Sequence, residues 1–294
     1  MIKRAILCIV VVGCSSNNNP SDAYGNFEAT EITVSAESTG RLLAFNVEEG
    51  ARLEAGALVG IIDTSQLAIQ KSLLLSSLSA IRQKAGSMDP QISVVEEQIR
   101  VAEREKKRIQ NLIVADAATT KQLDDISGQI DILGRQLSAT RAQKESILAE
   151  IGPVLKQVDQ VNDLVRKCYI YNPISGTVLT RFVEQDEIIT YGRPLYLIAD
   201  VSTMFLRVYI SGSQLPGIKL GEEADLLIDS GRGDSAGMST LRGVVDWISA
   251  KAEFTPKVIQ TREERVNLVY AVKIRVANDG RIKIGMPGEA NFKP

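Results

Sequence analysis

The amino-acid sequence predicts an elongated α+β protein in which a long antiparallel helical hairpin separates the two halves of a small β-sandwich. Two observations predict this fold class. Two glycine-punctuated stretches align without gaps when Gly40 is placed on Gly176, an offset of 136 residues that indicates an internal repeat. The hundred or so residues between the repeats carry apolar residues at heptad spacing instead, which is typical of a coiled coil.

The first residues have the features of a secretory signal. A basic start is followed by an apolar run from Ala5 to Val12, which is too short to span a bilayer as a permanent helix. Val11-Val12-Gly13-Cys14 resembles a bacterial lipobox, in which the cysteine is acylated and becomes the mature N-terminus. An ordinary signal peptide that contains a cysteine is the alternative. We therefore expect a signal peptide over 1–13, lipidation at Cys14 and a flexible polar tether over 14–29.

The composition removes several classes of function. The chain has no histidine, which excludes a His-dependent catalytic triad, a His-ligated metal and a His acid–base pair. A formal net charge of −2 gives no indication of nucleic-acid binding. Cys8 leaves with the signal and Cys14 carries lipid, so Cys168 is unpaired, and its apolar setting predicts a small core residue. We expect no enzymatic activity, no cofactor and no metal site.

Each repeat contains strand-length apolar runs broken by glycine, enough for about four short strands. One repeat alone buries little apolar surface, so we expect 30–63 and 167–200 to close one sandwich by pseudo-symmetry. Gly50 aligns with Asp186, and both residue types tolerate a left-handed backbone, which predicts a tight turn at each. The turn residues expected in the sandwich are Gly40, Gly50, Gly56, Gly176, Asp186 and Gly192.

The insert over 64–166 is predicted to form the hairpin. Mostly apolar residues recur at alternating intervals of three and four from Leu67 to Ile113, and again from Leu123 to Val165. Three of these seam positions hold lysine (71, 106 and 144) and one holds threonine (140). Each arm of about 50 residues would extend roughly 75 Å. Gly86 to Pro90 should bend or interrupt the first arm, and Gly152-Pro153 the second.

The heptad is lost over Val114 to Ala118, where the chain is expected to turn back. Thr119 offers a hydroxyl for capping the second helix, with Gln122 three residues further on, as in a capping box. The tip of the hairpin is therefore expected near 115–119.

The last region, 201–294, is β-rich, with glycine and aspartate between runs of alternating polarity. In "LVYAVKIRV" the residues Val269, Ala271, Lys273 and Arg275 fall on one face. The strand candidates are Thr203–Ile210, Glu223–Ile228, Ser239–Ile248, Val266–Val276 and Glu289–Phe292.

The repeated halves resemble the biotinyl/lipoyl domain family, although the lysine-bearing turn of true carriers is missing, so no lipoyl or biotin attachment is expected. The whole layout resembles HlyD-like periplasmic adaptors (membrane fusion proteins): a split lipoyl-like β-sandwich, an inserted long antiparallel coiled-coil α-hairpin and a C-terminal β-barrel. The resemblance covers essentially the whole mature chain. It implies that 201–294 is the barrel, where "FTPKVIQTREERVNLVYAVKIRV" and "IGMPGEANF" carry the likeness.

The resemblance implies an adaptor that bridges an inner-membrane transporter and a TolC-type outer-membrane channel. An ABC-type transporter is favoured and a proton-driven pump is second. The family implies a homo-oligomeric ring, a hexamer, built by head-to-tail contacts and held in the periplasm by the N-terminal lipid, with the inner membrane favoured. The alternative is a structural envelope lipoprotein that uses its coiled coil as a spacer or binding arm.

The tip carries the most specific local likeness. Arg108, Leu112 and Thr119 follow the spacing R-x3-L-x6-S of adaptors that dock on TolC-type channels, with threonine in place of serine. The resemblance implies that leucine enters an apolar groove, arginine reaches channel carboxylates or carbonyls, and the hydroxyl forms a hydrogen bond. The alternative is that Arg108 and Thr119 are ordinary surface and capping residues.

Overall fold

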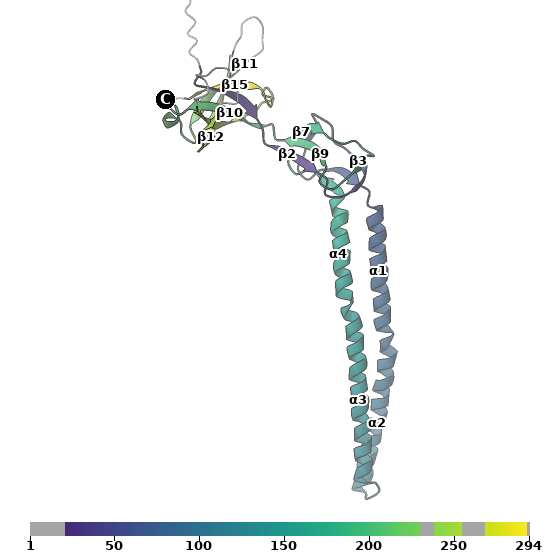
Figure 1. Ribbon diagram of the computed structural model, residues 1–294. Helices are drawn as coiled ribbons and strands as arrows, with labels where there is room; N and C mark the ends of the chain where they lie inside the picture. The colour runs from purple at the N-terminus through teal and green to yellow at the C-terminus, as the bar shows by residue number, and fades with distance from the viewer. Residues whose placement is uncertain (1–20, 230–237, 255–267, 293–294) are drawn as a thin grey trace, which may run out of the picture.

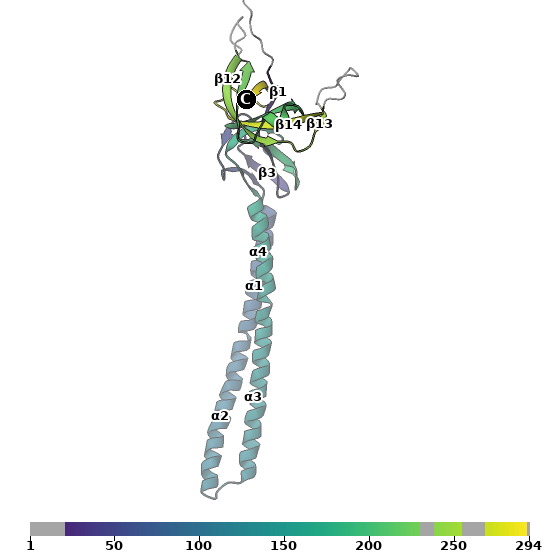
Figure 2. The ribbon, with the colours of Figure 1, turned by 90° about the vertical axis from the view of Figure 1, so that its left-hand side faces the viewer.

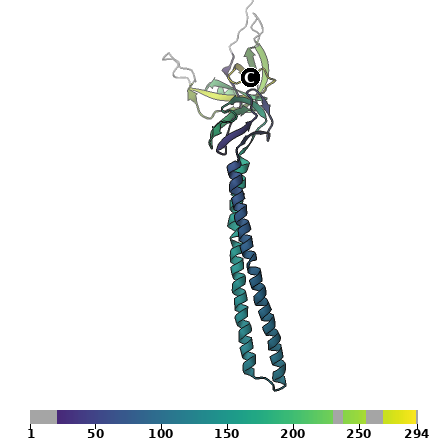
Figure 3. The same cartoon turned by 90° about the vertical axis from the view of Figure 1, so that its right-hand side faces the viewer.

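The computed structural model describes residues 21–229, 238–254 and 268–292. A β-barrel and a β-sandwich lie next to each other at one end of the protein, and a two-armed helical rod projects from the sandwich (Figure 1). Turned views show the same order of barrel, sandwich and hairpin along the molecule (Figures 2 and 3).

Two four-stranded sheets form the sandwich, and each sheet takes two strands from each repeat. One sheet has the order β2-β9-β7-β4 and the other β6-β5-β3-β8. At the offset of 136 residues, β2, β3, β4 and β5 correspond to β6, β7, β8 and β9, and exchanging each strand for its counterpart converts one sheet order into the other. Because each sheet contains strands from both repeats, neither repeat can complete a sheet alone. The first repeat supplies β2 (Glu31–Ser35), β3 (Gly40–Phe45), β4 (Arg52–Leu53) and β5 (Leu58–Ile62); the second supplies β6 (Tyr169–Tyr171), β7 (Gly176–Arg181), β8 (Ile188–Ile189) and β9 (Pro194–Ala199).

The pseudo-symmetry extends to individual main-chain hydrogen bonds. The amide of Gly50 donates to the carbonyl of Val178 (2.9 Å), and the amide of its equivalent, Asp186, donates to the carbonyl of Leu42 (2.8 Å). Because Val178 and Leu42 are themselves equivalent, each repeat makes the same contact to the other. The prediction that the two repeats close one sandwich is confirmed.

The sandwich core contains side chains from both repeats, with Leu42, Ile62, Ile189 and Ile198 fully buried. Cys168 is also fully buried, and its thiol donates to the hydroxyl of Ser38 (3.3 Å). It is a core residue, as predicted.

The hairpin has two arms, each with one break. The first arm is α1 (Ser65–Gly86) and α2 (Met88–Val114); the second is α3 (Thr120–Ala149) and α4 (Ile151–Lys167). Every residue of the predicted heptad seam is buried or half-buried, including the lysines at positions 71, 106 and 144. The stems of these lysines can therefore pack along the seam while their amines reach water.

Both breaks lie just before a proline. Proline has no amide hydrogen, and its ring collides with the carbonyl four residues earlier in a helix. Pro90 acts on Gly86, where α1 ends, and Pro153 acts on Ala149, where α3 ends. The second break therefore falls before Gly152-Pro153 rather than at it, and both are short gaps in a continuous arm.

The two breaks lie at the same level of the rod. The Lys144 ammonium binds the Asp89 carboxylate at 2.5 Å, and Arg141 binds Glu96 at 2.6 Å. These cross-arm ion pairs fix the antiparallel register, which sets Ser87 beside the stretch around Glu150. Each pair is partly exposed and contributes less than about 1 kcal/mol, so the apolar seam holds the arms together.

Beyond the sandwich, a six-stranded barrel closes in the order β10-β1-β15-β11-β12-β14, and β13 adds to β14. The closing pair is β10 with β14, which are antiparallel over nine residue pairs from Thr203↔Ala277 to Ser211↔Val269. The strands are β1 (Ala23–Glu28), β10 (Thr203–Ser211), β11 (Glu223–Asp229), β12 (Met238–Ile248), β13 (Glu253–Phe254), β14 (Leu268–Ala277) and β15 (Pro287–Phe292); a 3-10 turn, η1 (Leu215–Gly217), follows β10.

The structure corrects one boundary. The tether predicted over 14–29 is wrong for its last part, because Ala23–Glu28 forms β1 between β10 and β15 of the barrel. Phe27 is fully buried in the barrel core, and a Cβ on Gly25 would lie 1.8 Å from the carbonyl oxygen of Arg207. The barrel therefore needs this N-terminal strand in addition to 201–294.

Several predictions fall outside the described residues: the signal peptide over 1–13, lipidation at Cys14 and the first part of the tether. Most of the quoted stretch before Leu268, at 255–267, also lies outside them. Among the described helices, none combines the length and apolar character that a membrane crossing requires.

Candidate functional site

The hairpin turns through two capping motifs at its tip. The Asp116 backbone is left-handed (φ 54°), the Ala117 amide donates to the Leu112 carbonyl (2.8 Å), and the Asp116 amide donates to the Ile113 carbonyl (3.0 Å). These are the two hydrogen bonds of a Schellman motif, here with aspartate where glycine is usual. They fix the direction in which the chain leaves α2.

The second arm begins with the predicted capping box. The Thr119 amide donates to Oε1 of Gln122 at 2.9 Å, and Thr119 has extended backbone angles (φ −101°, ψ 152°). The tip is therefore a defined turn of five residues, 115–119, and its shape is set by the hydrogen bonds of these two caps.

The predicted docking residues occupy different environments around this turn. Arg108 is an exposed side chain on α2, and its guanidinium binds both carboxylate oxygens of Glu105 (2.5 and 2.9 Å). This hydrogen bond lowers the pKa of the Glu105 carboxyl. Leu112 is half-buried and Thr119 is exposed. The structure thus gives Arg108 a partner within its own helix, and the exposed Thr119 hydroxyl donates to Oε1 of Gln122 (3.3 Å).

Sequence reasoning did not assign a docking role to the most exposed apolar residue of the tip. Val114, the last residue of α2, has a relative exposure of 89%, the highest of the large exposed hydrophobic residues in the described parts of the chain. It follows the seam residue Ile113, so it points off the seam. Its position in the stretch where the heptad is lost was the available signal. Val114 adds an unpartnered apolar contact next to Leu112.

A groove of about 740 Å³ runs along the distal hairpin, where α2 and α3 lie side by side (Figure 2). Val94 and Val101 of α2 and Leu133 of α3 line it, and both valines are at least half exposed. Glu97 and Glu105 lie at its rim. The distal hairpin therefore shows apolar side chains outside the seam as well as at the tip.

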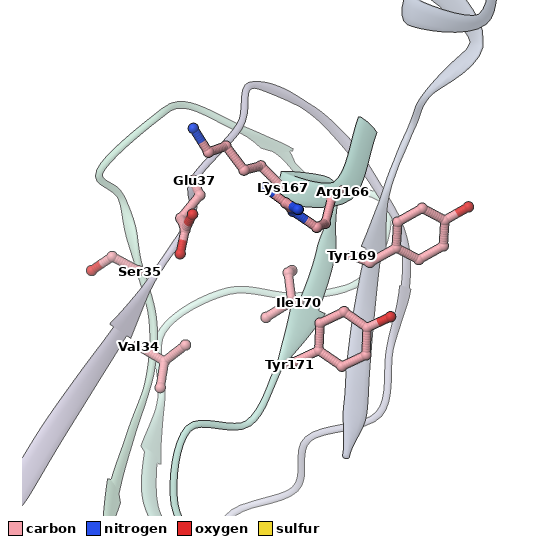
Figure 4. Close-up of a pocket in the computed structure, with 8 residues that line it drawn as sticks. All are labelled: Val34, Ser35, Glu37, Arg166, Lys167, Tyr169, Ile170 and Tyr171. Atoms are coloured by element: carbon pink, nitrogen blue, oxygen red, sulfur yellow. The ribbon is translucent and has the colours of Figure 1, made fainter. Parts of the chain in front are cut away.

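A smaller pocket of about 260 Å³ lies at the base of the hairpin (Figure 4). Val34 and Ser35 of β2, Lys167 at the end of α4, and Tyr169 and Tyr171 of β6 contribute to its lining. In Figure 4 the two tyrosine rings lie on the same side of β6. Both β2 and β6 are edge strands, so the pocket lies between the open edges of the two sheets.

The ionised groups at this base pair with one another. The Lys167 ammonium binds the Asp163 carboxylate at 2.8 Å, and Arg166 binds the same carboxylate. The hydrogen bond from Lys167 lowers the pKa of Asp163, and the pKa of Lys167 is raised in return. The arrangement stabilises the last turn of α4.

Four of the six glycine and aspartate residues predicted at sandwich turns have a left-handed backbone: Gly50 (φ 81°), Gly56 (79°), Asp186 (68°) and Gly192 (81°). Gly40 and Gly176 are different, because they begin β3 and β7. A Cβ on Gly40 would lie 2.8 Å from Ile62, and one on Gly176 would lie 2.5 Å from the Ala199 carbonyl oxygen. Their role is close strand approach, and the prediction of turns there is wrong.

Across the described residues, no group of three or more Cys, Asp or Glu side chains is arranged to hold a metal ion. The surfaces that stand out are the tip, the distal groove and the pocket at the hairpin base. The tip and the distal groove expose apolar side chains to water.

No family model matches the chain. It is 27% identical to the UPF0194 membrane protein of Yersinia enterocolitica, covering 98% of this chain and 95% of that relative. It is also 27% identical to the UPF0194 membrane protein in the asrC 5′ region of Acidithiobacillus ferridurans, covering 90% and 84%.

Among solved structures, MacA from Actinobacillus actinomycetemcomitans matches with a TM-score of 0.56 at 19% identity, over 92% of this chain and 77% of MacA. A MacA–MexA chimeric protein containing the Pseudomonas aeruginosa MexA α-hairpin domain matches with a TM-score of 0.55 at 20% identity, over 92% and 79%. Both matches extend over the barrel, the sandwich and the hairpin together. The chain thus has the fold of MacA, which fits the elongated layout of barrel, sandwich and hairpin expected from its resemblance to the HlyD-like periplasmic adaptors (membrane fusion proteins).

Proposed function

We propose that this protein is the periplasmic adaptor subunit of a tripartite efflux or secretion system, and that it bridges an inner-membrane transporter and a TolC-type outer-membrane channel. One observation carries the proposal: a two-armed helical rod projects from a sandwich (Figure 1), and the two halves of that sandwich precede and follow the rod in the sequence. Such a rod separates its tip from the barrel by tens of ångströms, which suits a protein that connects partners in two membranes.

The sandwich is proposed to be lipoyl-like and to act as the ring-forming module. Its two sheets are related by exchange of the repeats, as expected for a lipoyl-type domain cut at its central turn. Head-to-tail contacts between copies would close a ring, a hexamer in this proposal, with the hairpins gathered into a tube.

The hairpin tip is proposed to dock on the channel through Leu112, Thr119 and Val114. Leu112 and Val114 supply apolar contact, and the exposed Thr119 hydroxyl would exchange its bond to Oε1 of Gln122 (3.3 Å) for an acceptor on the channel. Arg108 would exchange its Glu105 partner for a channel carboxylate or carbonyl, which its planar guanidinium can bind through two hydrogen bonds.

The barrel end is proposed to face the inner-membrane transporter. An ABC-type exporter is favoured and a proton-driven pump is second. Lipidation at Cys14 would keep the barrel near the membrane, with the inner membrane favoured, and the protein would act by structural bridging with no bond chemistry.

The test uses the full chain in the parent bacterium with a photo-crosslinking amino acid at Val114 or at Ile69, an exposed apolar residue near the base of α1. Crosslinks to an outer-membrane channel should form from position 114 and not from position 69. Leu112→Asp should abolish these crosslinks and reduce export, whereas Leu155→Asp, at an exposed leucine of α4, should leave both unchanged.

The alternative function is a structural envelope lipoprotein whose coiled coil acts as a spacer. Crosslinking from position 114 to an envelope protein other than a channel would favour this alternative, as would unchanged export in a strain that lacks the protein.

A further inference from the structure

A pocket of about 370 Å³ lies on the outside of the barrel, where the chain leaves β1 for the sandwich. It includes the linker residues Ala29 and Thr30, the aromatic rings of Phe205 and Trp247, and four charged side chains: Glu28, Arg207, Asp246 and Lys273. Its volume is in the range of small-molecule sites.

The pocket contains two cations that the strand register sets side by side. Arg207 of β10 is directly opposite Lys273 of β14, and Lys273 is opposite Trp247 of β12. The Lys273 ammonium also lies 5.9 Å from the centre of the Trp247 ring. Like charges directly opposite each other across a sheet repel, so an anion between them stabilises this pair.

Glu28 currently provides that anion, but only loosely. Its carboxylate oxygens lie 3.9 Å from Arg207 and 4.0 Å from Lys273, both longer than a hydrogen bond. The Glu28 side chain is also more exposed (42%) than that of Arg207 (29%) or Lys273 (37%). Glu28 can therefore rotate into water with little loss.

The other nearby carboxylates do not fill this position. Asp246 is bound to Arg275 at 3.2 Å, and Glu253 approaches Arg207 from β13 at 3.4 Å. Among the described residues, the Lys273 ammonium has no hydrogen bond to a protein acceptor, and the buried Nε of Arg207 has none either. The guanidinium and the ammonium thus keep donors that an incoming carboxylate could use.

We propose that this pocket binds an organic carboxylate with a flat apolar group, and that the ligand displaces Glu28. The ligand carboxylate takes the position between Arg207 and Lys273, and a small shift of the guanidinium gives its Nε an acceptor. The apolar group lies against Phe205 and Trp247. An aromatic carboxylate fits both parts of the pocket better than a small inorganic anion, which would leave the rings uncovered.

Displacement of Glu28 would act on the connection between the barrel and the sandwich. Glu28 ends β1, and only Ala29 and Thr30 separate it from β2. The second connection, between β9 and β10, is fastened independently: Asp200 accepts hydrogen bonds from Ser202 (2.6 and 3.0 Å), and the Asn278 side chain donates to the Val201 carbonyl (2.9 Å). Ligand binding would therefore loosen one of the two connections and leave the other in place.

The chain contains one tryptophan, so fluorescence excited at 295 nm reports on Trp247 and hence on the pocket. The purified full-length protein is titrated with benzoate, with its neutral isostere benzamide and with acetate, which has the charge without the ring. Benzoate should give a saturable change with a dissociation constant at least about tenfold below that of benzamide, because one charge-assisted hydrogen-bonded pair contributes this much. Its dissociation constant should also be at least about tenfold below that of acetate, because acetate buries no ring against Phe205 and Trp247.

Two variants test the displacement itself. Arg207→Gln should weaken benzoate binding about tenfold or more, whereas Arg242→Gln, at an exposed arginine on the same strand as Trp247, should leave it within about twofold. Glu28→Gln should tighten benzoate binding about threefold or more, because it removes the competing carboxylate. A gain in affinity cannot come from a misfolded protein, so this variant tests the proposal even where Arg207→Gln is unstable.

Equal affinity for benzoate and benzamide would reduce the pocket to an apolar surface and overturn the proposal. Equal affinity for benzoate and acetate would overturn it too, because the rings would then make no contribution. Unchanged or weaker benzoate binding by Glu28→Gln would show that Glu28 is a structural ion-pair partner rather than the group that the ligand displaces.

Discussion

The sandwich and the hairpin are adjoining parts of one chain, yet they are stabilised in opposite ways. The sandwich buries a compact cluster of fourteen side chains drawn from both repeats. The hairpin is about one and a half times as long in sequence but buries only Leu78, Ala85, Val95, Ala102, Ile147, Val158 and Val161. The difference indicates that the sandwich provides stability and the hairpin provides length. Most of the hairpin surface is therefore exposed and available for contacts with the proposed partners.

The largest expected effect on stability comes from truncating a buried side chain of the sandwich, and the same kind of truncation in the hairpin should cost much less. Ile62→Ala removes a fully buried side chain of the sandwich core and should lower the free energy of unfolding by about 2–5 kcal/mol, through lost burial and a cavity. Leu133→Ala, on the half-buried seam, should cost about 1 kcal/mol because the site is already open to water. Native-state hydrogen exchange of the sandwich amides measures the loss caused by Ile62→Ala, and hydrogen exchange of the hairpin amides measures the loss caused by Leu133→Ala. Equal losses would remove the distinction between the two regions.

The sandwich core should also respond to alkaline pH through one buried phenol. The Tyr196 hydroxyl donates to the Asn172 side chain (3.0 Å), and burial raises the pKa of Tyr196 to about 12. An unfolded tyrosine ionises near pH 10, so its contribution is fully present below about pH 10 and is lost as the pH rises through about 12.

At roughly 1.4 kcal/mol per pH unit, this loss reaches up to about 3 kcal/mol. Urea denaturation of the sandwich between pH 9 and 12 measures it, with Tyr196→Phe as the matched control that lacks the ionising group. A sandwich whose stability falls equally in both proteins over this range would contradict the prediction.

The two repeats should differ at one pair of equivalent glycines. Gly176→Ala places a Cβ 2.5 Å from a main-chain oxygen, so strands must move, and the expected cost is about 1–3 kcal/mol. Gly40→Ala meets a side-chain methyl of Ile62 at 2.8 Å, which can rotate away, and should cost less. Thermal unfolding of the two variants measures the difference, and a larger loss for Gly40→Ala would show that the repeats tolerate strain differently from this account.

The smallest effect is expected at the breaks in the hairpin. Replacing both Pro90 and Pro153 by alanine restores two main-chain donors and should join α1 to α2 and α3 to α4. The free energy of unfolding should rise by about 1 kcal/mol or less, because proline in the first turn of a helix is tolerated. Spin labels at the tip and the base should show a narrower distance distribution. An unchanged distribution would mean that the seam alone sets the stiffness of the rod.

The sequence predicted what depends on local periodicity or on comparison of the repeats. The heptad seam was predicted in full because each helix repeats its own pattern, and the strands of the sandwich followed from the alignment of Gly40 with Gly176. The wrong assignment of turns at these two glycines arose because close strand approach and turn formation both require glycine.

The features that could not be predicted depend on contacts between residues that are distant in the sequence. The strand β1 was assigned to a tether because its partners, Tyr209 in β10 and Ala290 in β15, lie far along the chain, and its own residues alternate weakly. The cation pair of Arg207 and Lys273 was missed for the same reason, since only the closure of the barrel brings them together.

The central claim is that one folded module is interrupted by the hairpin, which can be removed without harm to the module. The amide of Ile62 donates to the carbonyl of Cys168 at 2.8 Å, so the two ends of the insert are adjacent. Replacing residues 64–167 by an Asn-Gly turn and measuring hydrogen exchange of β2 to β9 tests the claim directly. The account predicts that these amides stay protected and unfold cooperatively; loss of protection throughout the sandwich would contradict it.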